Sequence, residues 1–233
     1  MLRVEGLHAH YGRAHILADI GFEAGQGDVV ALLGRNGAGK STTMKAIMGL
    51  LRPSAGSVVF EGQRIDGLAP FRIARLGLGF VPEDRRVFTD LSVMENLEVG
   101  RQPPRAGARP WTPERLFALF PNLGRMRDRP GGRMSGGEQQ MLTIARTLMG
   151  NPRCVLLDEP SEGLAPLIVE QMANAIGALK AEGLTVILSE QNLHFSSRVA
   201  DHAVIIEKGG VRFAGTMAAL RADPSVREQY LSV

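Results

Sequence analysis

Apolar positions follow two periods along this chain, one typical of buried strands and one of helices. Short, mainly aliphatic runs indicate strands buried on both faces, and they lie at 29–33, 77–81, 154–158, 185–188 and 203–206. Other segments have apolar residues three and four positions apart, the spacing of a helix with one packed face. They lie at 42–50, 70–76, 92–97, 113–120, 135–149, 168–182, 217–221 and 225–231. The mixture predicts an α/β fold.

Two further regions predict a small antiparallel sheet beside this core. In residues 1–28, apolar residues alternate with polar ones, which is the period of a strand with one buried face. In residues 52–67, a turn at Pro53–Gly56 and a second turn at Glu61–Gly62 flank the apolar run Val58–Phe60, the pattern of a hairpin.

The loop after the first buried strand fits the phosphate-binding pattern Gly-x-x-x-x-Gly-Lys-Ser/Thr. It reads Gly34-Arg35-Asn36-Gly37-Ala38-Gly39-Lys40-Ser41. Glycines let backbone N–H groups face phosphate oxygens, and the N-terminus of the following helix adds partial positive charge. In this pattern Lys40 reaches the β- and γ-phosphates, and the Ser41 hydroxyl holds Mg²⁺. The sequence therefore predicts a nucleoside triphosphate site.

Two carboxylates end the buried run at 154–159. Paired acids at the end of a buried strand are costly unless a cation lies near them. Asp158 is therefore expected to hold Mg²⁺, and Glu159 to accept a proton from an attacking water.

The region 88–150 has helical character around a loop at 103–110, and we interpret it as a helical subdomain inserted in one domain that spans residues 1–233. Eight arginines lie between Arg101 and Arg133, so this region is basic. Such charge suits nucleic acid or anionic lipid. The arginines are scattered and no aromatic ladder accompanies them, which favours a solvated surface, and we expect no nucleic acid partner.

Composition limits the class of protein in three ways. The chain has 233 residues, 44% hydrophobic and 22% charged, with a formal charge of +3, as in an ordinary globular protein. No apolar run approaches the ~20 residues that span a bilayer, and the N-terminus has no apolar signal core. The single cysteine, Cys154, excludes an internal disulfide and is expected to be a small buried hydrophobe.

A second motif, Ser135-Gly136-Gly137-Glu138-Gln139-Gln140, opens the helix predicted at 135–149. Ser135 and Glu138 fit a capping box, which is a sufficient structural reason for both. The chain has, in this order, a phosphate loop, this motif and a strand that ends at Asp158-Glu159. This order resembles the ATP-binding cassette of ABC transporters. The resemblance covers essentially the whole chain and implies a mainly parallel core sheet, an antiparallel β subdomain and a helical subdomain.

Three shorter segments narrow the resemblance. Val81–Phe88, Gly163–Pro166 and Glu190–Asn192 are similar to one of the two cassettes of bacterial importers for branched-chain amino acids, or of their urea and short-amide relatives. The resemblance implies that these residues bind the nucleotide: Tyr11, Gly34, Asn36, Gly37, Ala38, Gly39, Lys40, Ser41, Thr42, Glu83, Ser135 and Gly137. It assigns catalysis to Glu159, Lys40 and Gln191, and Mg²⁺ to Ser41, Glu83 and Asp158.

Two of these residues have competing explanations. Tyr11 in a polar turn either stacks on adenine, as the resemblance implies, or packs as an ordinary aromatic. The Ser135 hydroxyl either caps its helix or meets the γ-phosphate of ATP held by a partner cassette; the neighbouring glycines favour the second role.

Three residues depart from the general cassette pattern. Glu83 stands where most cassettes have a glutamine, and its charge suits Mg²⁺ but repels an uncompensated phosphate. Gln191 replaces the switch histidine; it donates a hydrogen bond but carries no proton at neutral pH. Ala165 replaces an aspartate. All three agree with the importer subgroup, and they leave the rate of ATP hydrolysis open.

The resemblance implies an ATP-hydrolysing subunit of an importer, most specifically for branched-chain amino acids. Its cofactors are ATP and Mg²⁺, and it is expected on the cytoplasmic face of the inner membrane as a peripheral protein. Implied partners are a second cassette, identical or different, transmembrane permease subunits and, indirectly, a solute-binding protein. The alternatives are a urea or short-amide importer, a soluble cassette protein acting on ribosomes or DNA, and a nucleotide-binding subunit with little catalysis of its own.

Overall fold

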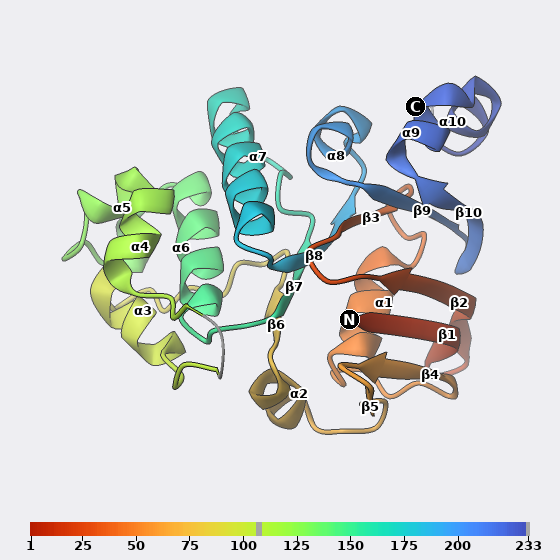
Figure 1. Ribbon diagram of the computed structural model, residues 1–233, viewed down its shortest axis with the longest axis horizontal. Coiled ribbons are helices and arrows are strands. Elements are labelled where there is room, and N and C mark those ends of the chain that lie inside the picture. Colours follow the sequence, from red (N-terminus) through yellow and green to blue (C-terminus); the bar gives the residue numbers. More distant parts are fainter. Residues whose placement is uncertain (106–108, 232–233) are drawn as a thin grey trace.

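A six-stranded sheet forms the centre of the computed structural model, which describes residues 1–105 and 109–231 (Figure 1). Its strand order is β10-β9-β3-β8-β7-β6, and every neighbouring pair is parallel except β10 with β9. The strands are β3 (Val29–Leu33), β6 (Leu78–Val81), β7 (Cys154–Asp158), β8 (Thr185–Glu190), β9 (His202–Glu207) and β10 (Gly210–Thr216). The predicted α/β fold with a mainly parallel core sheet is confirmed.

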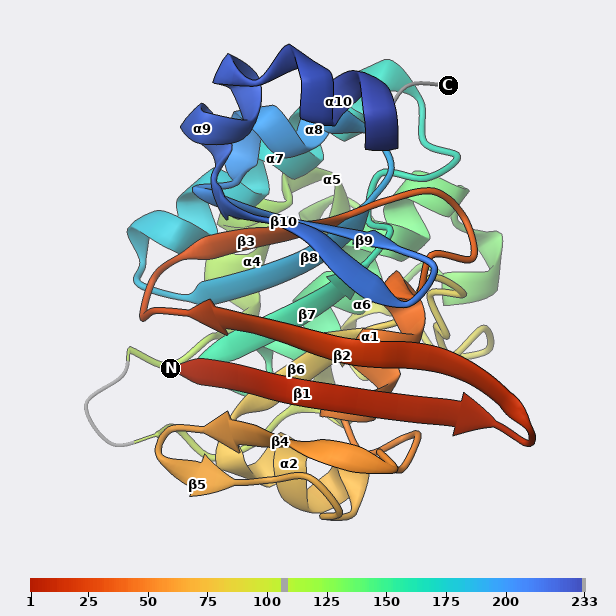
Figure 2. The ribbon, with the colours of Figure 1, turned by 90° about the vertical axis from the view of Figure 1, so that its right-hand side faces the viewer.

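A second, antiparallel sheet has the order β2-β1-β4-β5, and Figure 2 shows it nearest the viewer. Its strands are β1 (Leu2–Tyr11), β2 (Ala14–Ala24), β4 (Ala55–Phe60) and β5 (Gln63–Arg64). The helix α1 (Lys40–Ile47) contacts β2 of this sheet and β7 and β8 of the core sheet. Buried Met44 and Ile47 of α1 belong to one apolar core with residues of both sheets. The expected antiparallel sheet beside the core is therefore present.

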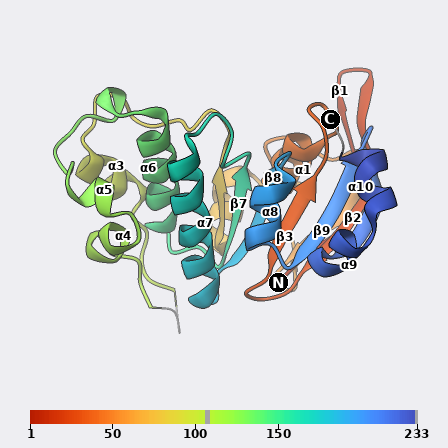
Figure 3. The ribbon, with the colours of Figure 1, turned by 90° about the horizontal axis from the view of Figure 1, so that it is seen from above.

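Helices gather at the opposite side of the core sheet, as Figures 1 and 3 show. Between β6 and β7 the chain forms α3 (Val93–Gly100), α4 (Pro113–Leu119), α5 (Pro121–Gly124), a 3₁₀ turn (Gly131–Arg133) and α6 (Gly136–Leu148). Ser92 and Ser135 begin α3 and α6 with capping boxes, as the Ser135-x-x-Glu138 pattern predicts. The boundaries 88–150 for a helical subdomain stay a prediction. Part of the loop expected at 103–110, residues 106–108, lies outside the described residues.

The remaining helices are α2 (Pro70–Leu76), α7 (Pro166–Ala181), α8 (Leu193–Val199), α9 (Met217–Ala222) and α10 (Pro224–Tyr230). Helix α8 and strand β10 were not predicted, and neither was the four-residue helix α5. Helix α8 is only two turns long, and β10 has no fully buried residue, so neither has a clear apolar period. Within the described ranges, no helix combines the length and the apolar character that crossing a bilayer requires.

Several arginines of the basic region bind groups of the protein itself. Arg105 donates to the carbonyl oxygens of Asn151, Arg75 and Ala74 at 2.7, 2.8 and 3.2 Å. Arg115 lies over the Trp111 ring, 4.2 Å from its centroid. These side chains join segments of the chain, so part of the basic character has a structural use beyond the solvated surface that we expected.

Candidate nucleotide-binding site

The phosphate loop connects β3 to α1, and its glycines take backbone conformations that other residues avoid. Gly39 has φ 117° and precedes the first residue of α1. A Cβ at Gly39 would lie 2.9 Å from Leu17, and one at Gly34 would lie 2.2 Å from the carbonyl oxygen of Ile206. Both positions therefore require glycine, which leaves the backbone N–H groups at the start of α1 free of side chains.

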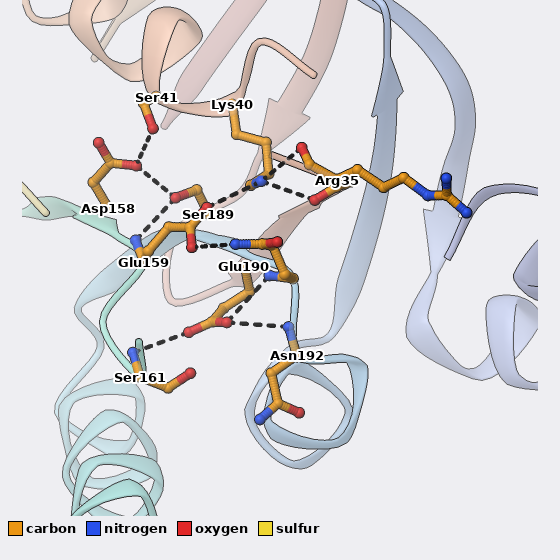
Figure 4. Close-up of polar contacts among 11 residues, drawn as sticks. Arg35, Lys40, Ser41, Asp158, Glu159, Ser161, Ser189, Glu190 and Asn192 are labelled. Carbon is orange, nitrogen blue, oxygen red and sulfur yellow. Dashed lines mark hydrogen bonds and ion pairs between the residues drawn. The ribbon is translucent and has the colours of Figure 1, made fainter. Parts of the chain in front are cut away.

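Lys40 begins α1 and is almost completely buried, at 3% exposure. Its ammonium donates to the carbonyl oxygens of Gly34 and Arg35 at 2.8 and 3.2 Å, and it pairs with Glu159 Oε1 at 3.0 Å (Figure 4). These three oxygens use all three donors of the ammonium. Phosphate oxygens that bind Lys40 must therefore take the place of at least one protein oxygen.

Asp158 ends β7 beside the phosphate loop and is 1% exposed. Its Oδ1 accepts hydrogen bonds from the Ser41 hydroxyl at 2.9 Å and the Ser189 hydroxyl at 2.6 Å. Ser189 lies on β8 and is the register partner of Asp158. The Ser41 hydroxyl and a buried carboxylate are hard oxygen donors, the type that Mg²⁺ prefers, so the two predicted ligands fit this ion.

Glu159 follows β7 with φ 48°, an uncommon conformation for a residue other than glycine. Its N–H donates to the Ser189 hydroxyl at 2.9 Å, and its side chain is 6% exposed. Oε1 meets Lys40, and Oε2 accepts from the Gln191 amide at 2.8 Å. The three residues predicted to be catalytic thus form one connected group at the ends of β7 and β8 and the start of α1.

Glu190, the last residue of β8, lies behind this group at 2% exposure. Its carboxylate accepts from three backbone N–H groups, those of Ser161 at 3.0 Å, Gln191 at 3.2 Å and Asn192 at 3.3 Å. Burial raises the pKa of Glu190, the hydrogen bonds from backbone N–H groups lower it in part, and the charge of Glu159 raises it further. Burial and Glu159 also raise the pKa of nearby Glu162.

A shallow pocket of about 400 Å³ opens above the phosphate loop. Tyr11 stands at its rim with 48% of its surface exposed, and the exposed Glu83 forms another part of its wall. Its lining comprises Tyr11, Ile16, Asn36, Gly37, Gly39, Lys40, Ser41, Thr42, Glu83 and Glu159. Ala38 and Gly34 belong to the same loop. The exposed Tyr11 ring faces solvent over a phosphate site, which suits stacking on a base better than core packing.

Ser135 and Gly137 do not line this pocket; they stand at the N-terminus of α6. The Ser135 hydroxyl accepts from the Glu138 N–H at 3.4 Å, and the Glu138 carboxylate accepts from the Ser135 N–H at 2.7 Å. The capping role is therefore real, and it uses the hydroxyl only as an acceptor. The O–H of this exposed serine stays able to donate to an anion from outside the chain, so the two proposed roles do not exclude each other.

Sequence reasoning missed Ser189, Glu190 and Ser161 as members of the site. Ser189 and Glu190 follow the predicted strand at 185–188. Polar residues at the end of a buried apolar run could therefore have indicated that they belong to the site. Their partners could not be predicted without the strand order, which sets β7 beside β8. Cys154 is buried, as expected, and burial raises the pKa of its thiol, so the thiolate is disfavoured.

Comparison with known proteins agrees with this geometry. Residues 17–162 match the family described as "ABC transporter". The branched-chain amino acid transport ATP-binding protein BraG of Pseudomonas aeruginosa is 41% identical over 231 residues, 99% of either chain. The lipopolysaccharide export ATP-binding protein LptB of Acidithiobacillus ferridurans is 34% identical over 99% of this chain and 96% of its own. An ABC transporter cassette solved in its ADP conformation superposes with a TM-score of 0.83 at 27% identity, covering 98% of this chain and 97% of its own. This chain belongs to the ABC transporter family, as one of its ATP-binding, ATP-hydrolysing cassettes.

Proposed function

We propose that this chain powers an importer for branched-chain amino acids. The observation that carries the proposal is the 41% identity to BraG over essentially the full length of both proteins. The Gln191 amide on Glu159 supports it, because a glutamine in place of the switch histidine agrees with the importer subgroup. The similarity to LptB keeps lipopolysaccharide export as the second candidate. Urea or short-amide import is the third.

In the proposed reaction, Tyr11 stacks on adenine and the loop from Gly34 to Thr42 binds the triphosphate. Lys40 exchanges protein oxygens for oxygens of the β- and γ-phosphates. Glu159, released from the ammonium, accepts a proton from the attacking water. Gln191 turns from Glu159 to donate to the γ-phosphate. Lys40 and Gln191 already contact Glu159, at 3.0 and 2.8 Å, so the three side chains lie close enough to act on one phosphate group.

We assign the Mg²⁺ site to Ser41 and Asp158, with Glu83 as a third oxygen from the rim of the pocket. The ion held by these oxygens would supply positive charge that neutralises the charge developing on the phosphate group. Ser189 holds Asp158 at 2.6 Å and so orients it toward Ser41.

A second cassette is the partner that the position of Ser135 and Gly137 favours. Both stand at the N-terminus of the 13-residue helix α6, outside the pocket of their own chain. We propose that they contact the γ-phosphate of ATP bound by that second cassette, identical or different.

An apolar groove of about 690 Å³ supports the proposal that a permease subunit docks on this chain. Phe71, Phe88 and Val99 are 56%, 46% and 53% exposed and line the groove. Arg75 and Arg146 lie over the rings of Phe71 and Phe88, with guanidinium carbons 5.5 and 4.9 Å from the centroids. Apolar walls with an arginine rim suit a cytoplasmic permease segment that has one apolar face and acidic residues. The chain would then lie on the cytoplasmic face of the inner membrane.

The assembled transporter tests the function directly. An affinity tag on this chain recovers it with its bound subunits, and ATPase activity in liposomes is then measured with a panel of solutes. We expect leucine, isoleucine or valine, with the solute-binding protein, to stimulate hydrolysis. Stimulation by urea or amides, or by lipopolysaccharide alone, would replace the proposal by the corresponding alternative. The Phe71→Glu variant should lose the stimulation and retain basal hydrolysis.

A further inference from the structure

Buried Glu190 connects two segments that carry different parts of the reaction. One carboxylate oxygen, Oε1, faces the N–H of Ser161, two residues after Glu159. The other, Oε2, faces the N–H groups of Gln191 and Asn192. Figure 4 shows the carboxylate between the turn that holds Ser161 and the turn that holds Asn192. Within the described part of the chain, no cation pairs with Glu190.

We propose that Glu190 is a positioning residue that fixes the Gln191 amide against Glu159 and makes the two turns move together. This inference rests on the proposed roles of Glu159 and Gln191. Burial of a carboxylate with no cation beside it is costly, so its presence at this point needs a reason. The reason is geometric: the carboxyl group offers one acceptor oxygen in each of the two directions.

The two turns depend on each other through this side chain. The Gln191 N–H and side chain have fixed partners, Glu190 Oε2 at 3.2 Å and Glu159 Oε2 at 2.8 Å. The Ser161 N–H ties the segment after Glu159 to the other oxygen of the same carboxylate. A displacement of the turn at Ser161 therefore pulls on Glu190, and through it on the backbone that carries Gln191. We therefore infer that the two turns change conformation together.

The substitution Glu190→Gln tests this chemistry with little change in shape. Its amide group must point an N–H₂ at either Ser161 or the Gln191–Asn192 pair, so one turn loses its acceptor. We expect kcat for ATP hydrolysis to fall about tenfold, with KM for ATP changed less than twofold. Glu98→Gln is the matched control: it removes a surface carboxylate that is 62% exposed, pairs with Arg101 and contacts neither turn. It should change kcat by less than about twofold.

A double variant separates positioning from general damage. If Glu190 acts through Gln191, Glu190→Gln should lower kcat no further in a Gln191→Ala background, because coupled residues are not additive. The same fractional loss in both backgrounds, or no loss in either, would overturn the inference. Hydrolysis by the wild-type chain and its loss in Glu159→Gln test the proposed function separately.

Hydrogen–deuterium exchange of the wild-type chain tests the coupling of the two turns even where the variants fail to fold or the isolated chain is inactive. Peptides that cover 159–163 and 190–193 are followed without nucleotide and with Mg²⁺ and the non-hydrolysable analogue AMP-PNP. We expect the protection of both peptides to change in the same direction and over the same range of analogue concentration. A change in one peptide while the other stays constant would refute the coupling.

Discussion

The ion pair of Lys40 with Glu159 makes the substitution Glu159→Gln informative beyond the loss of a catalytic base. The two charges lie 3.0 Å apart, with side-chain exposures of 3% and 6%. At an effective dielectric constant of about 20, this attraction is roughly 5 kcal/mol before desolvation is counted. Removing one partner of a buried pair leaves the other charge uncompensated, which typically costs about 3–5 kcal/mol. The carbonyl oxygens of Gly34 and Arg35 remain on the ammonium, so we expect a smaller loss of about 2 kcal/mol.

This loss should be regained when ATP binds, because phosphate oxygens compensate Lys40 in the absence of the carboxylate. Affinity for Mg²⁺ and AMP-PNP should therefore increase, by roughly thirtyfold for 2 kcal/mol. Removing a negative charge next to the bound phosphates acts in the same direction. ATP hydrolysis should nearly cease, since Glu159 is the proposed base, and the ATP-bound closed dimer should accumulate.

Two measurements check this reasoning. Urea unfolding without nucleotide gives the free energy of unfolding of each protein, and calorimetry with the analogue gives its Kd. Glu98→Gln is the matched control, because Glu98 pairs with Arg101 at 2.8 Å on the surface, with side-chain exposures of 62% and 46%. It should change neither quantity measurably. Unchanged unfolding together with weaker analogue binding in Glu159→Gln would refute the view that Glu159 is the counterion of Lys40.

Three further substitutions address neighbouring contacts. Lys40→Ala should weaken ATP binding at least about tenfold, since it removes a phosphate ligand worth more than 1.4 kcal/mol; equal affinity by calorimetry would contradict the phosphate-loop assignment. Ser189→Ala removes the 2.6 Å bond that holds Asp158, so the Mg²⁺ concentration for half-maximal ATPase should rise several-fold; an unchanged value would argue against its orienting role. Glu190 has a raised pKa, so the folded protein keeps its proton at pH values where the unfolded chain has lost it. The unfolding free energy of the wild type minus that of Glu190→Gln should therefore fall as pH rises above about 4.3, and a rise in urea titrations would contradict this.

Much of the site was predictable because its residues stand at the ends of elements with a clear apolar period. Lys40 and Ser41 begin a helix after a buried strand, and Asp158 and Glu159 end another such strand. The glycine pattern and the paired acids then indicate phosphate and metal chemistry without any three-dimensional information. The fold class followed from the same periods, together with the resemblance.

The remaining contacts depend on strand order and register, which a periodic pattern does not contain. Asp158 meets Ser189 because β7 and β8 are neighbours and pair these two residues directly. The same apolar pattern is compatible with another strand order, in which Asp158 would have a different partner. Two elements were not predicted for a related reason: β10 has no fully buried residue and α8 has only seven residues, so neither sequence shows a clear apolar period.

Strand order also explains why one edge of the sheet carries the residues proposed for several steps of the reaction. β3, β8 and β7 are consecutive parallel neighbours, so their carboxyl ends deliver the phosphate loop, Gln191 and the acid pair to one edge of the sheet. At that edge Lys40 and Gln191 both contact Glu159, each through a different carboxylate oxygen. In the proposed mechanism, a γ-phosphate would attract both donors and so free both oxygens of Glu159 at once. ADP lacks that group and should leave at least the Gln191 contact in place. If Glu159 is the base, as we propose, its availability is tied to the presence of the phosphate bond that it helps to cleave.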